Sequence, residues 1–209
     1  MEKKDKPIVC ILFILVALLF AGNSSVWPAG VTAVGTGLKS EPGGNAALPA
    51  FELPMPGSER EKSYLGLSGT GTFTIGQIKT QVLIVEVYSF YCPHCQRSAA
   101  QVNELYQRIQ ERPELKEKVK MIGIAVTNGT YEVDSYRERY KVPFPLIPDK
   151  DTEISQKLGV KGTPTFIGIK IDGRGSPERF YFGEGGFEDT QQFLAKIIQL
   201  SGLKLGGNR

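Results

Sequence analysis

The clearest pattern in the chain is an apolar run at residues 82–88, followed by a segment with helical periodicity. The run is rich in β-branched residues and contains one charge, Glu86, which predicts a central strand buried on both faces. Across residues 93–111 the apolar positions recur at helical spacing: Ala99, Val102, Tyr106 and Ile109. Pro93 suits a first helical turn, so we expect a helix directly after the strand.

Strands and helices continue to alternate toward the C-terminus. The pattern predicts strands at residues 119–126, 144–147, 165–171 and 178–182, and helices at residues 130–140, 151–158 and 187–200. This alternation implies a sheet that helices cover on both faces, and Asp172-Gly173 is typical of a tight antiparallel hairpin. The expected fold is therefore α/β, with a central mixed sheet flanked by helices.

The segments before residue 82 are less regular. Residues 51–80 alternate β-prone pieces with glycines, which indicates a hairpin-like N-terminal β extension. Residues 23–47 are rich in Gly, Ser, Ala and Pro, which predicts a flexible linker. We expect one folded domain at residues 48–203 and a C-terminal tail at residues 204–209.

The first 22 residues differ from the rest of the chain. Three early lysines precede an unbroken apolar stretch at residues 8–21 that includes Cys10, which is the layout of a secretory signal peptide. Because a bilayer span needs about 20 apolar residues, a cleaved signal peptide and a membrane anchor at residues 7–22 both stay open. Either one places the domain in the periplasm or another exported compartment, soluble after cleavage or anchored to the inner membrane.

Composition and charge limit the function classes. The chain has 209 residues, of which 41% are hydrophobic, and a formal net charge of +3, so it can bury one core of ordinary size. Its charged residues are scattered, and a continuous basic face for binding phosphates is missing. Nucleic acid is therefore not an expected partner.

Outside the apolar stretch the cysteines are Cys92 and Cys95. An exported protein can keep disulfides, yet two thiols three positions apart cannot link distant parts of the chain, which favours redox chemistry. At the start of a helix they lie about one turn apart on one face, and the helix N-terminus stabilises a thiolate on the first. We predict that Cys92 is the nucleophile and Cys95 the resolving thiol.

The Cys92-Pro93-His94-Cys95 segment could also form half of a zinc site. A structural zinc site takes four ligands, and His94 is the chain's one histidine, so we expect neither a metal nor another cofactor. An imidazole between the thiols would instead stabilise the neighbouring thiolate. The alternative is a surface histidine without a role.

Two further features lie near the expected strand ends. Glu86 should have a raised pKa, because an unpaired buried charge is costly, and it could then exchange a proton with Cys95. The alternative is a carboxylate that faces water or a lysine. The Thr163-Pro164 bond precedes an apolar strand, where proline cannot donate to the sheet, so a cis bond is predicted over a trans bond at the strand's start.

The chain resembles the thioredoxin superfamily over residues 48–200. The resemblance rests on Phe90-Tyr91-Cys92-Pro93-His94-Cys95, with Glu86 upstream and Gly162-Thr163-Pro164-Thr165 downstream. The tetrapeptide is typical of the DsbA group. The resemblance implies a thioredoxin-like fold, attack on a substrate disulfide by Cys92 and assistance to Cys95 from Glu86. It also implies that Thr163, beside Pro164, binds the substrate backbone.

Other segments resemble the TlpA and redoxin branch instead. They are Tyr140-Lys141-Val142-Pro143-Phe144-Pro145-Leu146, Asp149 and Gly159-Val160-Lys161-Gly162-Thr163-Pro164. The stretch between Cys95 and Thr163 is also too short for the inserted helical domain of the DsbA group. The scaffold therefore resembles TlpA and the active loop resembles DsbA, which leaves the direction of electron flow open.

Four functions are compatible with this pattern. The first is an exported enzyme that oxidises or isomerises protein disulfides, since a low-pKa cysteine makes a disulfide oxidising. The second is a TlpA-like reductase serving cytochrome c maturation or other exported thiols. A peroxidase is third, although its Pro-x-x-x-Thr/Ser-x-x-Cys pattern is met at Ser89 and not at Val85; a non-enzymatic chaperone is fourth. Expected partners are protein or peptide thiols and disulfides, and a membrane or periplasmic redox partner.

Overall fold

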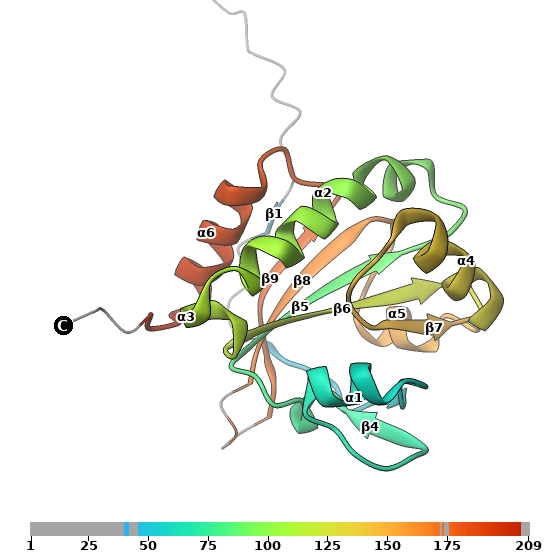
Figure 1. Ribbon diagram of the computed structural model, residues 1–209, viewed down its shortest axis with the longest axis horizontal. Helices are drawn as coiled ribbons and strands as arrows, with labels where there is room; N and C mark the ends of the chain where they lie inside the picture. The colour runs from blue at the N-terminus through green and yellow to red at the C-terminus, as the bar shows by residue number, and fades with distance from the viewer. Residues whose placement is uncertain (1–39, 42–45, 172, 174–175, 206–209) are drawn as a thin grey trace, which may run out of the picture. The chain divides into compact units, whose positions relative to one another are not determined.

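The computed structural model describes residues 40–41, 46–171, 173 and 176–205. Its centre is a sheet with the strand order β9-β8-β5-β6-β7 (Figure 1). These strands are β5 (Val82–Tyr88), β6 (Val119–Val126), β7 (Leu146–Asp149), β8 (Thr165–Lys170) and β9 (Glu178–Glu184). β5, β6 and β7 are parallel, whereas β8 runs antiparallel to both β5 and β9. The predicted central mixed sheet is confirmed.

Helices cover both faces of this sheet (Figure 1). One face carries α2 (Pro93–Gln110), α3 (Pro113–Lys116), α4 (Thr130–Tyr140) and α6 (Thr190–Ser201). The other carries α1 (Glu59–Leu65), α5 (Glu153–Lys157), the 3-10 turn η1 (Ile75–Gln77) and the hairpin of β3 (Glu52–Pro54) and β4 (Thr72–Thr74). Parallel strands joined through a helix connect right-handedly, and β5-α2-β6 and β6-α4-β7 step the same way across the sheet. For that reason α2 and α4 share a face.

Strand β5 is the structural basis of the site because every one of its side chains is buried. Successive side chains of a strand point to opposite faces, so Ile84 and Tyr88 pack in the core under α2, whereas Val85 and Val87 pack in the core on the α5 side. Glu86 lies between Ile84 and Tyr88 in this alternation. The sheet geometry therefore aims its carboxyl group at the underside of α2.

The N-terminal part differs most from the predicted elements. The β-prone interpretation of residues 51–80 gives the β3-β4 hairpin but misses α1, which is too short to show a helical period. The start of α1 is nevertheless encoded, since the hydroxyl of Ser58 accepts a hydrogen bond from the Glu61 N–H at 3.2 Å, an N-cap contact. Two short strands, β1 (Ser40–Glu41) and β2 (Ala46–Ala47), pair with β9 inside the expected linker.

Smaller differences concern element ends. β7 begins at Leu146 rather than residue 144, and α5 is shorter at both ends than the predicted helix. In the predicted turn Gly173 has the left-handed φ of 71°, while Asp172 lies outside the described residues, as do residues 1–22 with the expected signal peptide or anchor. None of the helices that the structure describes is long and apolar enough to span a bilayer.

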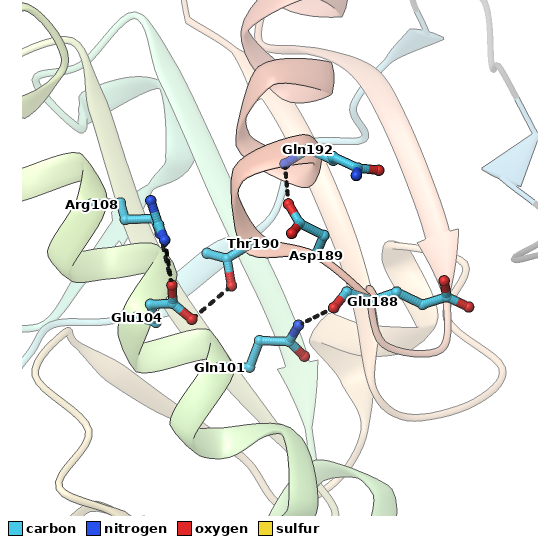
Figure 2. A network of polar contacts seen from close by, with 7 residues as sticks. All are labelled: Gln101, Glu104, Arg108, Glu188, Asp189, Thr190 and Gln192. Atoms are coloured by element: carbon cyan, nitrogen blue, oxygen red, sulfur yellow. Dashed lines mark hydrogen bonds and ion pairs between the residues drawn. The ribbon is translucent and has the colours of Figure 1, made fainter.

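A polar network fastens α6 onto α2 (Figure 2). The Glu104 carboxylate accepts hydrogen bonds from Thr190 Oγ1 at 3.0 Å and from Arg108 Nε at 2.8 Å. One turn earlier on α2, Gln101 Nε2 donates to the Glu188 carbonyl oxygen at 2.8 Å. These contacts hold the middle of α2, the helix that carries Cys95 in its first turn, against the start of α6.

The cap of α6 gives a prediction about stability. Asp189 Oδ1 accepts the Gln192 N–H at 2.7 Å (Figure 2), which satisfies one of the free N–H groups at the helix start. Asp189→Ala should therefore lower the free energy of unfolding by about 1 kcal/mol. Asp189→Asn should retain most of this stabilisation, because its amide oxygen can also accept the Gln192 N–H. Urea unfolding curves of both variants measure this. Equal losses in the two would show that the cap is not the cause.

Candidate active site

The two thiols lie where β5 ends and α2 begins. Cys92 is the N-cap residue of α2 and Pro93 occupies the first helical position. The Cys95 N–H points at Cys92 Sγ at 3.4 Å, so the sulfur takes the place of a capping oxygen. Both cysteines are free thiols; Cys92 is partly buried and Cys95 fully buried. The two thiols therefore lie one helical turn apart and differ in their access to solvent.

The Thr163-Pro164 loop lies against the first thiol. The bond between these residues is cis, as predicted, and Cys92 Sγ donates to the Thr163 carbonyl oxygen at 3.3 Å. Beside this contact is an open groove of about 390 Å³, lined by Ser89, Tyr91, Cys92, Val126, Thr127, Val160, Lys161, Gly162 and Thr163. A ligand in the groove would therefore touch the reactive sulfur and the loop together.

The surroundings of Cys92 favour its thiolate. Partial burial raises its pKa, but hydrogen bonds with the side chains of Thr163 and Cys95 and with the backbone N–H groups of Cys95 and His94 outweigh burial, so the pKa lies below its ordinary 9.0. Burial, followed by the hydrogen bond to Cys92, raises the pKa of Cys95 far above that value. Of the two thiols, Cys92 is therefore the one that ionises at the lower pH.

This separation of pKa values predicts selective alkylation. When the reduced protein reacts with iodoacetamide at mildly acidic pH, Cys92 should carry the adduct and Cys95 should stay unmodified, because the thiolate is the reacting form. Peptide mapping by mass spectrometry locates the adduct. Preferential labelling of Cys95 would reverse the assignment of nucleophile and resolving thiol.

Glu86 is buried, with 2% of its surface exposed. It pairs with Gly123 on β6 and Phe166 on β8 in the centre of the sheet. Burial, with a smaller effect from the charge of Cys92, raises its pKa from 4.5 to about 8, as predicted. Its Oε1 atom has no hydrogen-bond partner among the described residues, and its charge also raises the pKa of Cys95. A carboxyl group poised near neutrality thus lies within electrostatic reach of both thiols.

Tyr136 and Tyr88, which the sequence analysis did not identify, lie within electrostatic range of this carboxyl group. The Tyr136 hydroxyl donates to the Cys95 carbonyl oxygen at 3.0 Å, which ties the first turn of α2 to α4. The Tyr88 ring packs on the Tyr136 ring with centroids 4.4 Å apart. Burial raises the pKa of both tyrosines, with Glu86 as the next cause in each. They keep the space beneath Cys95 closed to solvent.

Asn128 is a second residue that sequence reasoning missed. Its side chain is fully buried, and its Oδ1 accepts the Phe90 N–H at 2.7 Å, which fixes the short loop between β5 and Cys92. A signal existed, since Asn128 closely follows β6, and adjacent parallel strands end at the same edge of a sheet. A buried polar residue at that edge indicates a tether for the neighbouring loop.

His94 is positioned differently from the expectation. Its side chain is exposed, and its Nδ1 lies 3.0 Å from an Arg97 guanidinium nitrogen. Arginine can only donate, so Nδ1 is the acceptor in this contact. His94 acts on the Cys92 thiolate through its backbone N–H, not through the imidazole. Within the described residues no three His, Cys, Asp or Glu side chains form a metal-binding group.

Comparisons with known proteins agree with this architecture. The chain is 26% identical over 115 residues to thiol-disulfide oxidoreductase ResA of Geobacillus thermodenitrificans, a match covering 55% of this chain and 62% of that protein. The chain thus spans less than two thirds of this relative's length.

Two solved structures show the same fold. One is a hypothetical protein of Sinorhizobium meliloti, with 15% identity, a TM-score of 0.57 and coverage of 83% of this chain and 93% of that one. The other is a secreted thiol-disulfide isomerase of Corynebacterium glutamicum, with 16% identity, a TM-score of 0.53 and coverage of 75% and 86%. The fold is therefore thioredoxin-like, on the TlpA and redoxin type of scaffold that the sequence resembled.

The sequence model of the AhpC/TSA family matches residues 45–186. This region contains the central sheet, both thiols and the cis-proline loop. The chain belongs to the AhpC/TSA family.

Proposed function

We propose that the chain is an exported thiol-disulfide oxidoreductase that acts on protein thiols and disulfides through a reversible Cys92–Cys95 disulfide. One observation carries the proposal: a partly exposed, low-pKa thiol at a helix start faces the Thr163-Pro164 loop, with a buried second thiol one turn away. The Lys-rich and then apolar start of the chain supports export.

Cys92, Cys95 and Glu86 can carry out a complete thiol-disulfide exchange with a substrate disulfide. The Cys92 thiolate attacks one sulfur of a substrate disulfide; the S–S bond breaks, a mixed disulfide forms and the leaving thiolate takes a proton. The ionised fraction of Glu86 removes the proton of Cys95, whose thiolate attacks Cys92 Sγ and releases the second substrate sulfur as a thiolate. That thiolate then takes up a proton, and Glu86 gives up the one it received. The substrate gains two electrons and the enzyme becomes the disulfide. With a pKa of about 8, Glu86 has both protonation states available near pH 7.

The favoured direction is reduction of the substrate, as in the TlpA-like alternative. Hydrogen bonds with the side chains of Thr163 and Cys95 and with two backbone N–H groups lower the Cys92 pKa, and reducing members of the fold such as thioredoxin also have a lowered cysteine pKa. The His94 imidazole contacts Arg97, and His94 acts on Cys92 only through its backbone N–H. The ResA relative points the same way. A membrane or periplasmic redox partner would return electrons to the Cys92–Cys95 disulfide.

Oxidation or isomerisation of protein thiols is the second candidate, and the low pKa of Cys92 favours it, because a stable thiolate makes the disulfide form oxidising.

Thiol-disulfide exchange, which both candidate functions share, is tested by insulin reduction with dithiothreitol as the electron source. The protein should accelerate the precipitation of the insulin B chain. No acceleration would overturn the proposed oxidoreductase activity.

A further inference from the structure

The edge of the active site carries exposed aromatic side chains. Within the described residues three large hydrophobic side chains are exposed: Tyr91 (62%), Tyr131 (78%) and Leu200 (42%). Single exposed apolar residues are ordinary on a protein surface. Two of these three, however, belong to the loop that carries Cys92 and to the first turn of α4, and a hydrogen bond from Tyr91 to Glu132 joins these two segments.

A hydrogen bond joins the Tyr91 side chain to the first turn of α4, which also carries Tyr131. The Tyr91 hydroxyl donates to Glu132 Oε1 at 3.1 Å, and Glu132 follows Tyr131 directly in α4. The Glu132 carboxylate is held in turn by the Gly129 N–H at 2.9 Å. This bond to Glu132, with a smaller effect from Tyr131, raises the pKa of Tyr91. The Tyr91 ring is thereby fixed next to α4 while most of it stays in contact with solvent.

The Tyr131 ring has no evident role inside the protein. Its hydroxyl makes no hydrogen bond to a described residue, and no aromatic ring of the described part packs against it. Ring burial against a partner is favourable in proportion to the apolar area removed from water, and tyrosine loses little conformational entropy when it is immobilised. An exposed ring of this kind is suited to contact with another molecule.

The groove that Tyr91 and Cys92 line indicates which kind of partner fits. It begins at Tyr91 and Cys92, has the apolar Val126 and Val160 in its lining, and carries one charged residue, Lys161. An extended chain with a cysteine at Cys92 would lie along this groove and place a neighbouring side chain against the tyrosines. The lining is compatible with an uncharged or acidic chain and gives a basic one no counter-charge.

We propose that Tyr91 and Tyr131 form an aromatic rim that binds a large apolar side chain of an extended polypeptide segment whose cysteine reacts with Cys92. This inference rests on the proposed function and names its substrate class: proteins unfolded enough to expose an apolar residue next to a disulfide. The rim acts on binding, so its loss should raise KM and leave kcat unchanged.

Two cyclic disulfide peptides that differ by Phe or Ser next to one cysteine test the rim. The parent protein should reduce the Phe peptide with a KM about tenfold lower than that of the Ser peptide, a typical effect of one buried aromatic contact. Tyr131→Ser should abolish this preference and Tyr131→Phe should retain it. Leu200→Ser, the matched control on α6, should leave both KM values unchanged. Because Tyr131 is exposed, Tm should not change in Tyr131→Ser.

The outcomes distinguish a loss of substrate binding at the rim from a defect in thiol exchange. Equal KM values for the two peptides in the parent, or an unchanged preference in Tyr131→Ser, would overturn the rim. A fall in kcat with both peptides would also overturn it, since the defect would then lie in thiol exchange. If sedimentation shows a dimer that Tyr131→Ser dissociates, the rim binds a second copy and the inference is wrong. A parent that reduces neither peptide would instead overturn the proposed function.

Discussion

Cys92→Ser is expected to abolish disulfide reduction, with turnover of insulin falling at least about a thousandfold. The reason is that the substituted hydroxyl has no accessible anionic form near neutral pH, whereas the Cys92 thiol has a pKa lowered by the hydrogen bonds around it, and the thiolate is the attacking species. The dithiothreitol-coupled insulin assay measures the loss. Far-UV circular dichroism of the variant checks that the fold is intact.

Cys95→Ser is the matched variant and should behave differently. Cys92 can still attack, but without the buried resolving thiol the substrate should stay attached to Cys92 as a mixed disulfide. Non-reducing electrophoresis followed by peptide mapping detects that species. Substrate captured by Cys92→Ser instead, or full activity in either variant, would contradict the assigned order of attack.

Glu86→Gln should slow the release step about a hundredfold at pH 7. The amide has nearly the same size but cannot take the proton of Cys95, whose pKa burial raises far above neutrality. The first attack by Cys92 should change little, so the mixed disulfide should accumulate in this variant during turnover. Rapid acid quenching and mass spectrometry measure the two steps separately. Equal rates of both steps in parent and variant would remove Glu86 from the mechanism.

The same substitution should change the pH dependence of stability. The unfolded chain loses the Glu86 proton near 4.5, whereas the folded protein keeps it to about 8. Between these values the unfolded state binds fewer protons, so the parent's free energy of unfolding falls as pH rises, by about 1.4 kcal/mol per unit at most. Urea unfolding from pH 4 to 9 should show that Glu86→Gln lacks this decline. Parallel curves for the two proteins would contradict a raised pKa.

The central part of the fold could be predicted because its patterns are strong. β5, α2, β6 and α4 lie within a residue of the expected bounds, since a continuous apolar run and a long helical period each have few alternative structures. α1 could not be predicted, because seven residues give too short a pattern. β1 and β2 pair with β9 through backbone groups, which leave little trace in side-chain sequence.

The site also has features that the sequence could predict and features that it could not. The thiols, the raised pKa of Glu86 and the cis bond before Pro164 follow from residue type and local position. The contacts of Tyr136 and Asn128 with the Cys92 loop and α2 depend on how α4 and the end of β6 pack, which a single sequence does not contain. The pairing of His94 with Arg97 is a local i,i+3 contact, so the spacing of these two residues in the sequence is compatible with it.

The reduction potential of the Cys92–Cys95 couple tests the proposed reductase most directly. It is measured by equilibrating the protein with defined ratios of reduced and oxidised dithiothreitol or glutathione and quantifying the free thiols. We expect a value close to that of thioredoxin, about −270 mV, because hydrogen bonds with Thr163, Cys95 and the backbone favour the Cys92 thiolate and the His94 imidazole contacts Arg97 instead. A value of about −120 mV, as in DsbA, would contradict the proposed reductase and make the protein an oxidant.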